Sequence, residues 1–305
     1  MMDQAWWGDF LLATLRAATP LGFCALGVLL SERAGVLNIG VEGAMLAGAL
    51  AAVTAGVLTG SAWAGLLAAS LIGLVGGIIL AYLTVVLPAD QVVTGIAFNM
   101  VSLGATSFVY KVLVARGIKL IGPDVLSSFG PGLKQVPVIG YFASISPLTY
   151  VAVTLTVLIY LFLFRSGPGL LWRSAGENAH AAHAAGINVF RVRLAAIILG
   201  TVLASLGGAS LTLAWVRSFT DNITMGRGFI ALAAVYFGRW HPMWALGAAL
   251  LFGAGEALAF RAQAAGVGLN PYYYMMVPYV LTLLAVAFMG RAVGPRDAGK
   301  PYVRG

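Results

Sequence analysis

The sequence predicts an all-α polytopic membrane protein with roughly eight to ten transmembrane helices, some of them broken or half-length. Of its 305 residues, 60% are hydrophobic and only 9% are charged. Soluble chains have about 45–50% apolar and about 25% charged residues, so lipid must cover much of this apolar surface. The chain has 39 glycines but only 12 prolines, which indicates closely packed membrane helices, since small residues let the backbones approach. We expect one transmembrane domain over residues 1–305.

The first half of the chain contains four apolar runs, each with about the 20 residues that a spanning helix needs. They cover residues 10–30, 36–58, 62–87 and 92–114. Pro20 is expected to bend the first helix. Gly73 and Gly77, four residues apart in the third run, are a helix-contact signal. Asn99 lies inside the fourth run and is a candidate for lining a polar path.

The second half is less regular. Full-length apolar runs cover residues 148–164, 194–215, 243–260 and 272–289, whereas residues 228–238 are apolar but too short to cross alone and predict a half-helix. Residues 116–146 are rich in glycine, proline and charge and predict a long external loop. A basic tail, residues 291–305, ends the chain.

Residues 31–52 gather charge and glycine between the first two runs. Glu32 and Arg33 precede Gly35, and Asn38 precedes Glu42, after which the sequence is apolar again. An ionisable group at membrane depth is costly and is a functional hypothesis by default. Asparagine and glycine at a helix entrance predict a helix that starts late or unwinds briefly where it lines a cavity.

A similar entrance follows in the second half. Asn222-Ile223 precedes Arg227-Gly228, as Asn38-Ile39 precedes Glu42-Gly43, and both lead into apolar helices. Two interrupted helix starts in corresponding positions favour an inverted repeat with a translocation path at its interface. Glu42 and Arg227 would then pair or share a water-lined path, with Asn38 and Asn222 nearby. The alternative is that each caps its own helix start at a membrane surface. For Glu256 the sequence offers no explanation.

The segment from Trp172 to Ala196 is polar but helical in character. Its alanines favour a helix, and their small side chains allow close contact with a partner. Gly176 and Gly186 are expected to bracket this helix, and Glu177 would lie in its first turn, where a carboxylate suits the helix dipole.

Three stretches, residues 32–49, 172–196 and 222–240, closely resemble the permease subunits of ABC importers, in the branch for nucleosides and simple sugars. The resemblance implies a multi-pass protein of the bacterial inner membrane, with a nucleoside as the first choice of solute and a simple sugar as the second. It implies a second permease subunit, homologous or identical, a pair of cytoplasmic ABC ATPases and an extracytoplasmic substrate-binding protein. It also makes residues 172–188 a cytoplasmic coupling helix, with the candidate contacts Arg173, Gly176, Glu177, Asn178, Ala182 and Gly186.

The chain lacks the signatures of an enzyme. It has no G-x-x-x-x-G-K-[ST] motif, so ATP and Mg²⁺ are expected on a partner ATPase and no cofactor in this chain. Its single cysteine, Cys24, and its three histidines form no metal-binding spacing. The net charge of +8 comes from residues scattered at the ends of apolar runs. This pattern fits retention on the cytoplasmic side of a membrane and not nucleic-acid binding.

Orientation follows from the tail, because the loops on both sides of the 148–164 run carry similar positive charge. The basic tail favours a cytoplasmic C-terminus. If residues 228–238 count as one crossing, this places residues 165–193 inside, and residues 116–146 and the N-terminus outside. The rival function is a self-sufficient secondary transporter that uses Glu42 as a proton or sodium site and needs no coupling helix. An intramembrane enzyme ranks last because no catalytic set is present.

Overall fold

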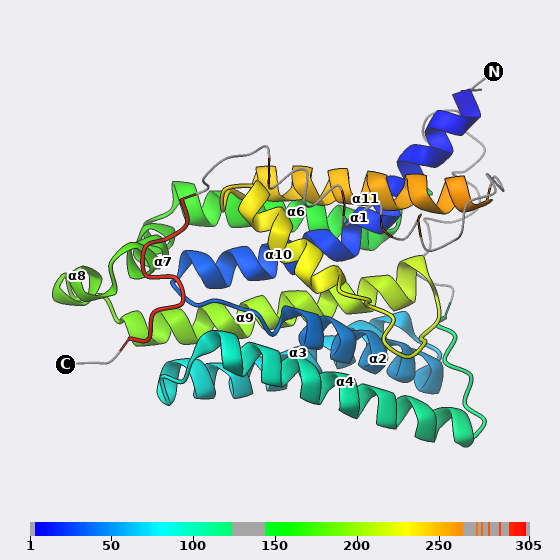
Figure 1. Ribbon diagram of the computed structural model, residues 1–305, viewed down its shortest axis with the longest axis horizontal. Helices are drawn as coiled ribbons and strands as arrows, with labels where there is room; N and C mark the ends of the chain where they lie inside the picture. The colour runs from blue at the N-terminus through cyan, green and yellow to red at the C-terminus, as the bar shows by residue number, and fades with distance from the viewer. Residues whose placement is uncertain are drawn as a thin grey trace.

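The computed structural model describes residues 4–123, 144–264 and 293–302, together with Tyr273, Met276, Val280 and Ala287. The helices run mostly along the long axis of the molecule (Figure 1). In chain order they are α1 (Gln4–Arg33), α2 (Val41–Thr59), α3 (Ala62–Ala81), α4 (Gln91–Ala115), α6 (Pro147–Arg165), α7 (Gly167–Glu177), α8 (Ala179–Ala184), α9 (Val189–Ser210), α10 (Arg227–Phe237) and α11 (Pro242–Ala264). Two π-helical turns, η1 (Tyr82–Val86) and η4 (Leu211–Trp215), extend α3 and α9.

Seven of the described helices are long and apolar enough to cross a membrane. They are α1, α2, α3 with η1, α4, α6, α9 with η4, and α11. α10 is a short apolar helix of 11 residues, as predicted for residues 228–238. The all-α polytopic fold is therefore confirmed. The predicted run 272–289 lies outside the described residues, apart from four single positions.

α9 lies at the centre of the bundle and packs against α1, α2 and α3. Glycine makes these contacts close: a Cβ on Gly208 of α9 would lie 1.8 Å from the carbonyl oxygen of Met45 in α2. Gly73 and Gly77 of α3 both face α9, and a Cβ on Gly77 would lie 2.8 Å from the Cα of Ile198. The helix contact predicted from their spacing is confirmed, because only small residues let the backbones approach so closely.

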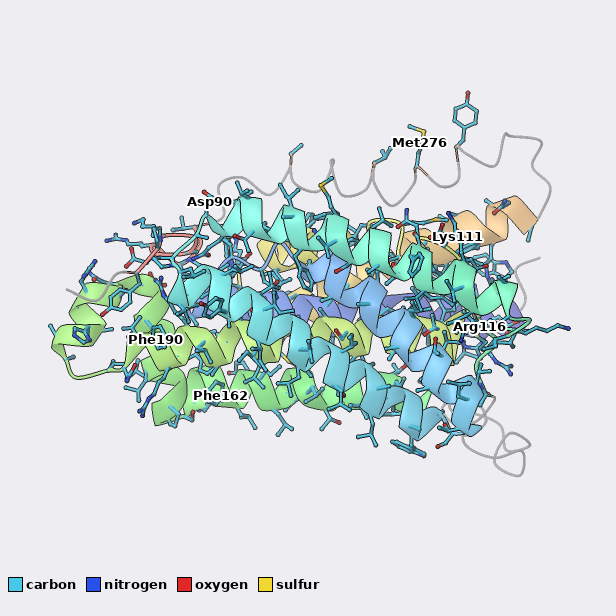
Figure 2. The ribbon with its side chains drawn as sticks, turned by 90° about the horizontal axis from the view of Figure 1, so that it is seen from below. Asp90, Lys111, Arg116, Phe162, Phe190 and Met276 are labelled. Carbon is cyan, nitrogen blue, oxygen red and sulfur yellow. The ribbon has the colours of Figure 1, made fainter. Side chains whose placement is uncertain are left out.

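α4 lies at the edge of the bundle (Figure 2), where it runs from the labelled Asp90 to Lys111 and Arg116. Most of its apolar residues are not buried inside the bundle. Large side chains such as Met100 and Phe108 are about 70% exposed. In a membrane protein such an apolar surface contacts lipid or a second subunit, because lipid offers no partners for polar side chains.

The two ends of the bundle differ. α7, α8 and the tail residues 293–302 lie together at one end (Figure 1). At the other end the chain after α4 pairs with the chain after η4, because the Gly122 amide donates to the carbonyl of Arg217 at 2.9 Å and the Phe219 amide to that of Leu120 at 3.1 Å. Of the predicted loop 116–146, the structure describes residues 116–123 and 144–146.

Several predicted boundaries are wrong by a few residues, for local reasons. α2 begins at Val41, not at residue 36, because residues 36–40 after α1 form turns and irregular chain and not a helix. α9 begins at Val189, not at residue 194, because the Asn188 side chain accepts a hydrogen bond from the Arg191 amide at 3.1 Å and caps the helix there. The polar segment 165–193 contains two helices, α7 and α8.

Candidate functional site

The first candidate site begins where α2 starts late. α1 ends at Arg33, Gly35 turns the chain with a φ of +91°, and α2 begins only at Val41. In Figure 1 the segment after α1 runs back beside α9 before α2 begins part-way along the bundle. The prediction of a late helix start is confirmed. Glu42, in the first turn of α2, is consequently only 9% exposed.

The Glu42 carboxylate binds the start of α10, in the other half of the chain. Its Oε1 accepts hydrogen bonds from the Thr224 hydroxyl at 2.6 Å and the Gly226 amide at 2.8 Å. Its Oε2 accepts one from the Gly228 amide at 2.7 Å. All three donors are neutral, so the carboxylate is satisfied by hydrogen bonds and the positive end of the α10 dipole.

α10 needs this external carboxylate because it has no cap of its own. Its N-cap residue is Gly226, which has no side chain and a φ of +81°. Asn222 and Met225 before it also have positive φ values, so the approach to α10 is a tight left-handed turn. The first amides of a helix lack intrahelical acceptors. Glu42 supplies the acceptors that a Ser, Thr or Asp cap normally supplies.

The contact also depends on close backbone approach. A Cβ on Gly228 would lie 2.7 Å from the Cα of Glu42, so a side chain there would push α10 away from α2. On the other side of α2, Asn99 of α4 accepts a hydrogen bond from the Gly43 amide at 2.7 Å and donates one to the carbonyl of Ile39 at 2.9 Å. The start of α2 is thus held between α4 and α10.

Arg227 is the first residue of α10 and contacts α11. Its guanidinium forms an ion pair with Glu256, and both side chains are about 12–13% exposed. A further guanidinium nitrogen donates to the carbonyl of Ile223 at 2.9 Å, and the group lies 5.1 Å from the ring centre of Trp215. The pairing explains why an acidic residue stands in α11, since a buried charge needs a partner.

The second candidate site is the end of the bundle that carries α7 and α8. The Asn178 side chain separates these helices and caps α8 by accepting a hydrogen bond from the Ala181 amide at 2.9 Å. One face of α8 is buried, because Ala179 and Ala182 pack with Ala175 and Val189. The opposite face is exposed and carries His180, Ala181, His183 and Ala184.

The tail lies against this end and contacts both short helices. Asp297 accepts a hydrogen bond from the Ala179 amide at 2.8 Å and pairs with Lys300 at 3.0 Å. Partial burial raises the pKa of Asp297, but the hydrogen bonds from Ala179 and Lys300 and the nearby charges of Lys300 and Arg193 outweigh it, so the pKa lies below its usual value. The Asp297 carboxylate is therefore charged at neutral pH.

The sequence of the whole bundle matches known transport proteins. The family model described as the permease component of the branched-chain amino acid transport system matches residues 10–286. The chain belongs to this permease family. It is 38% identical over 306 residues to the guanosine ABC transporter permease protein NupQ of Bacillus subtilis, which covers 96% of both chains. It is 36% identical over 298 residues to the nucleoside ABC transporter permease protein NupC of Lactococcus lactis, which covers 94% of both chains.

The name of a third relative of the permease specifies a different solute. The putative glucose ABC transporter permease protein TsgC13 of Haloferax volcanii is 36% identical over 261 residues, 85% of this chain and 79% of its own. No solved structure matches the chain. The resemblance found from three motifs thus extends over residues 10–286.

The structure brings only part of the predicted path of the permease together. Asn99 binds the backbone of Gly43 and Ile39, on either side of Glu42 at the start of α2, but not the Glu42 side chain itself. The predicted pairing of Glu42 with Arg227 is wrong, because Arg227 pairs with Glu256 while Glu42 binds backbone amides of α10. The alternative, that each residue caps its own helix, is also wrong for Glu42, because the helix that it caps is α10.

The two other asparagines lie apart. Asn38 is 1% exposed, and its side chain lies close to Gly200 of α9, with no hydrogen-bond partner among the described residues. Asn222 is exposed on the turn before α10. They do not form one polar cluster with Glu42 in this conformation.

The segment predicted to couple the permease to an ATPase, residues 172–188, also differs from its predicted form. Gly176 lies inside α7 and does not bracket α8, and Glu177 is the last residue of α7, not in the first turn of the next helix. The break falls at Asn178, because this side chain caps α8. Gly186, with a φ of +85°, does end the segment. Ala182 is 4% exposed and packs against the permease itself.

Four residues of these sites were not found from the sequence. Thr224, Glu256, Arg193 and Asp297 each contact a residue far away in the chain. For Glu256 the sequence does hold one signal. An acidic residue inside an apolar run requires a cation, and Arg227 directly precedes another apolar run. For the others no sequence signal distinguished them from ordinary polar positions. In the described residues no group of three or more His, Cys, Asp or Glu could hold a metal ion.

Proposed function

We propose that the chain is the membrane-spanning permease subunit of an ABC importer for nucleosides in a bacterial inner membrane. The observation that carries the proposal is the full-length similarity to NupQ and NupC, whose names specify guanosine and nucleoside. ATP hydrolysis belongs to separate cytoplasmic ATPase subunits, because this chain lacks a phosphate-binding P-loop. An extracytoplasmic binding protein delivers the solute.

The second permease subunit is a different chain. The relatives include two guanosine permeases of Bacillus subtilis, NupQ and NupP, and two nucleoside permeases of Lactococcus lactis, NupC and NupB. This chain is 38% and 36% identical to NupQ and NupC, but only 26% and 24% identical to NupP and NupB, over 64% and 78% of its length. These two pairs of relatives support a heterodimer with a partner similar to NupP or NupB. The exposed apolar face of α4 offers a surface for it.

In the assembled importer, α8 receives the motion of the ATPases. Its exposed face is small, as docking into a groove requires, and it stands at the end of the bundle with the basic tail. We place this end in the cytoplasm. The start of α2 and the start of α10 belong to the substrate path, because transporters typically form this path with discontinuous helices. Glu42 joins these two starts in the conformation seen here.

Transport in reconstituted vesicles tests the proposal. The permease is co-expressed with its ATPase, second permease and binding protein, and uptake of labelled guanosine is measured with ATP inside or absent. We expect uptake only with ATP and none with an ATPase whose P-loop lysine is replaced. Uptake that persists without ATP would establish a secondary transporter instead.

A competition experiment tests the solute class. Unlabelled adenosine in excess should abolish guanosine uptake, whereas glucose and ribose should leave it unchanged. Uptake of labelled glucose that guanosine does not inhibit would assign the chain to the sugar branch, to which TsgC13 points.

A further inference from the structure

Arg193 is a buried charge whose acceptors lie in the tail. Its side chain, at the start of α9, is only 2% exposed. One guanidinium nitrogen donates to the carbonyl oxygen of Lys300 at 2.7 Å, another to that of Asp297 at 3.4 Å, and the group lies 5.7 Å from the ring centre of Tyr302. A buried guanidinium without acceptors is strongly unfavourable, so these contacts hold the tail against α9.

Asp297 joins both short helices to the same tail. Its backbone amide donates to the carbonyl of Gly176 in α7 at 2.9 Å. Its carboxylate accepts a hydrogen bond from the amide of Ala179, the first residue of α8, at 2.8 Å. The Tyr302 ring lies beside α8, with its centre 5.6 Å from that of His180 and 6.2 Å from that of His183, and leaves both histidines exposed.

The tail also reaches the ends of α1 and α10. The Gly299 amide donates to the carbonyl of Gly35, directly after α1, at 3.3 Å. Gly294 lies against the ring of Trp240, just after α10, and a Cβ at this position would be 2.7 Å from it. Residues 293–302 therefore contact the ends or starts of α1, α7, α8, α9 and α10, which the red segment beside α7 and α8 in Figure 1 illustrates.

α8 depends on such support because six residues do not form a stable helix alone. Its own buried contacts come from two alanines, which provide little apolar area. Without the tail, α8 would be connected to the bundle only by the chain at its two ends and by this small patch. A force applied to its exposed face would then move α8 and leave the transmembrane helices in place.

We propose that residues 293–302 form a C-terminal clasp that positions α8, with Asp297 and Arg193 as positioning residues, so that α8 moves together with the ends of α1 and α9. Through the clasp, α8 and the bundle move as one rigid body. Its role in transport rests on the proposed function, in which α8 receives the motion of the ATPases.

Hydrogen exchange on the purified permease tests the clasp without any partner. Asp297→Ala removes the acceptor for the Ala179 amide, and we expect exchange of the α8 amides to rise about fivefold, the effect of losing a helix cap. Asp297→Asn keeps an oxygen acceptor and should restore most of the protection. Asp9→Ala, which removes an exposed carboxylate near the N-terminus marked in Figure 1, is the matched control. Unchanged exchange in α8 of Asp297→Ala overturns the clasp.

The ratio of guanosine taken up to ATP hydrolysed, measured on the reconstituted importer, tests its role in coupling. Asp297→Ala should lower this ratio several-fold at normal assembly, Asp297→Asn should recover it, and Asp9→Ala should not change it. An unchanged ratio in Asp297→Ala, despite raised exchange in α8, overturns the positioning role. A wild-type protein without ATP-dependent uptake refutes the proposed function instead, while the exchange experiment still decides whether the clasp exists.

Discussion

Two buried charges in the described part of the chain, Glu42 and Arg193, are held mainly by neutral groups of the backbone. Glu42 accepts hydrogen bonds from two amides and a hydroxyl, and Arg193 donates to two carbonyls of the tail. Arg227 and Glu256 differ, because they form an ion pair between two helices. A charge held by backbone dipoles fixes the position of a chain segment, whereas a charge pair fixes two side chains. The two arrangements predict different responses to mutation.

Glu42→Gln keeps the size of the side chain but replaces one acceptor oxygen with an amino group, which faces a donor. We expect a loss of about 1–3 kcal/mol in stability and a fall in transport, because an amide at the start of α10 loses its acceptor. Thermal unfolding of the purified permease and guanosine uptake are the measurements. Thr224→Val is the milder comparison, since it removes one donor only. Unchanged stability and uptake in Glu42→Gln would show that the bond to α10 contributes nothing.

Arg227→Gln and Glu256→Gln form a double-mutant cycle. Each single change leaves one buried charge without its partner, whereas the double change removes both charges. We therefore expect the double mutant to be clearly more stable than the sum of the single losses predicts. The cycle of Arg227→Gln with Glu42→Gln is the control and should show weaker coupling, because these side chains do not pair. Equal coupling in both cycles would contradict the assigned pairs.

At the scale of the elements, two short helices, α8 and α10, are capped by side chains from other elements. α10, with 11 residues, uses Glu42 of α2, and α8, with six residues, uses Asp297 of the tail in addition to its own Asn178. Short helices are marginal by themselves, so such contacts decide whether and where they form. The same contacts attach each helix to the element that supplies the cap. Movement of one element is thereby transmitted to the other.

The two faces of α8 should respond differently to the same substitution. Ala182→Arg places a long charged side chain in the buried face, and we expect the permease itself to lose stability or fold poorly. Ala184→Arg places it on the exposed face, so thermal unfolding should stay unchanged while ATP-driven uptake falls. The measurements are unfolding of the isolated permease and uptake by the importer. Normal uptake by Ala184→Arg, in normally assembled importer, would remove this face from the ATPase contact.

At the scale of the whole molecule, the bundle has one end with α7, α8 and the tail and another with the paired segments 116–123 and 216–219. Figure 2 places Asp90 and Phe190 toward the first end and Arg116 toward the second. The tail and the coupling segment were expected on the same side of the membrane, and they lie at the same end of the structure. The side on which this end lies is part of the proposed function.

Cysteine labelling in intact cells tests this orientation. Arg116→Cys and His183→Cys, each in a Cys24→Ala background, place a thiol at an exposed position at opposite ends of the bundle. An impermeant maleimide added outside should label position 116, and position 183 only after the cells are opened. The Cys24→Ala protein alone is the blank. Labelling of both positions from outside would contradict the assignment of α8 to the cytoplasm.

The spans and the family could be predicted from the sequence, because lipid demands long apolar runs and because the three motifs are local stretches of chain. The late start of α2, the half-helix α10 and the contact of Gly73 and Gly77 were likewise readable from local composition. The partners of Glu42, Arg227 and Asp297 were not, and the predicted pair of Glu42 with Arg227 was wrong. Their partners in other helices lie 29 to 186 residues away in the chain, so only the packing of the bundle selects them. A buried carboxylate requires hydrogen-bond donors, and backbone amides satisfy it as well as a cation does. Every residue other than proline carries such an amide, so the sequence alone does not tell which residues will donate.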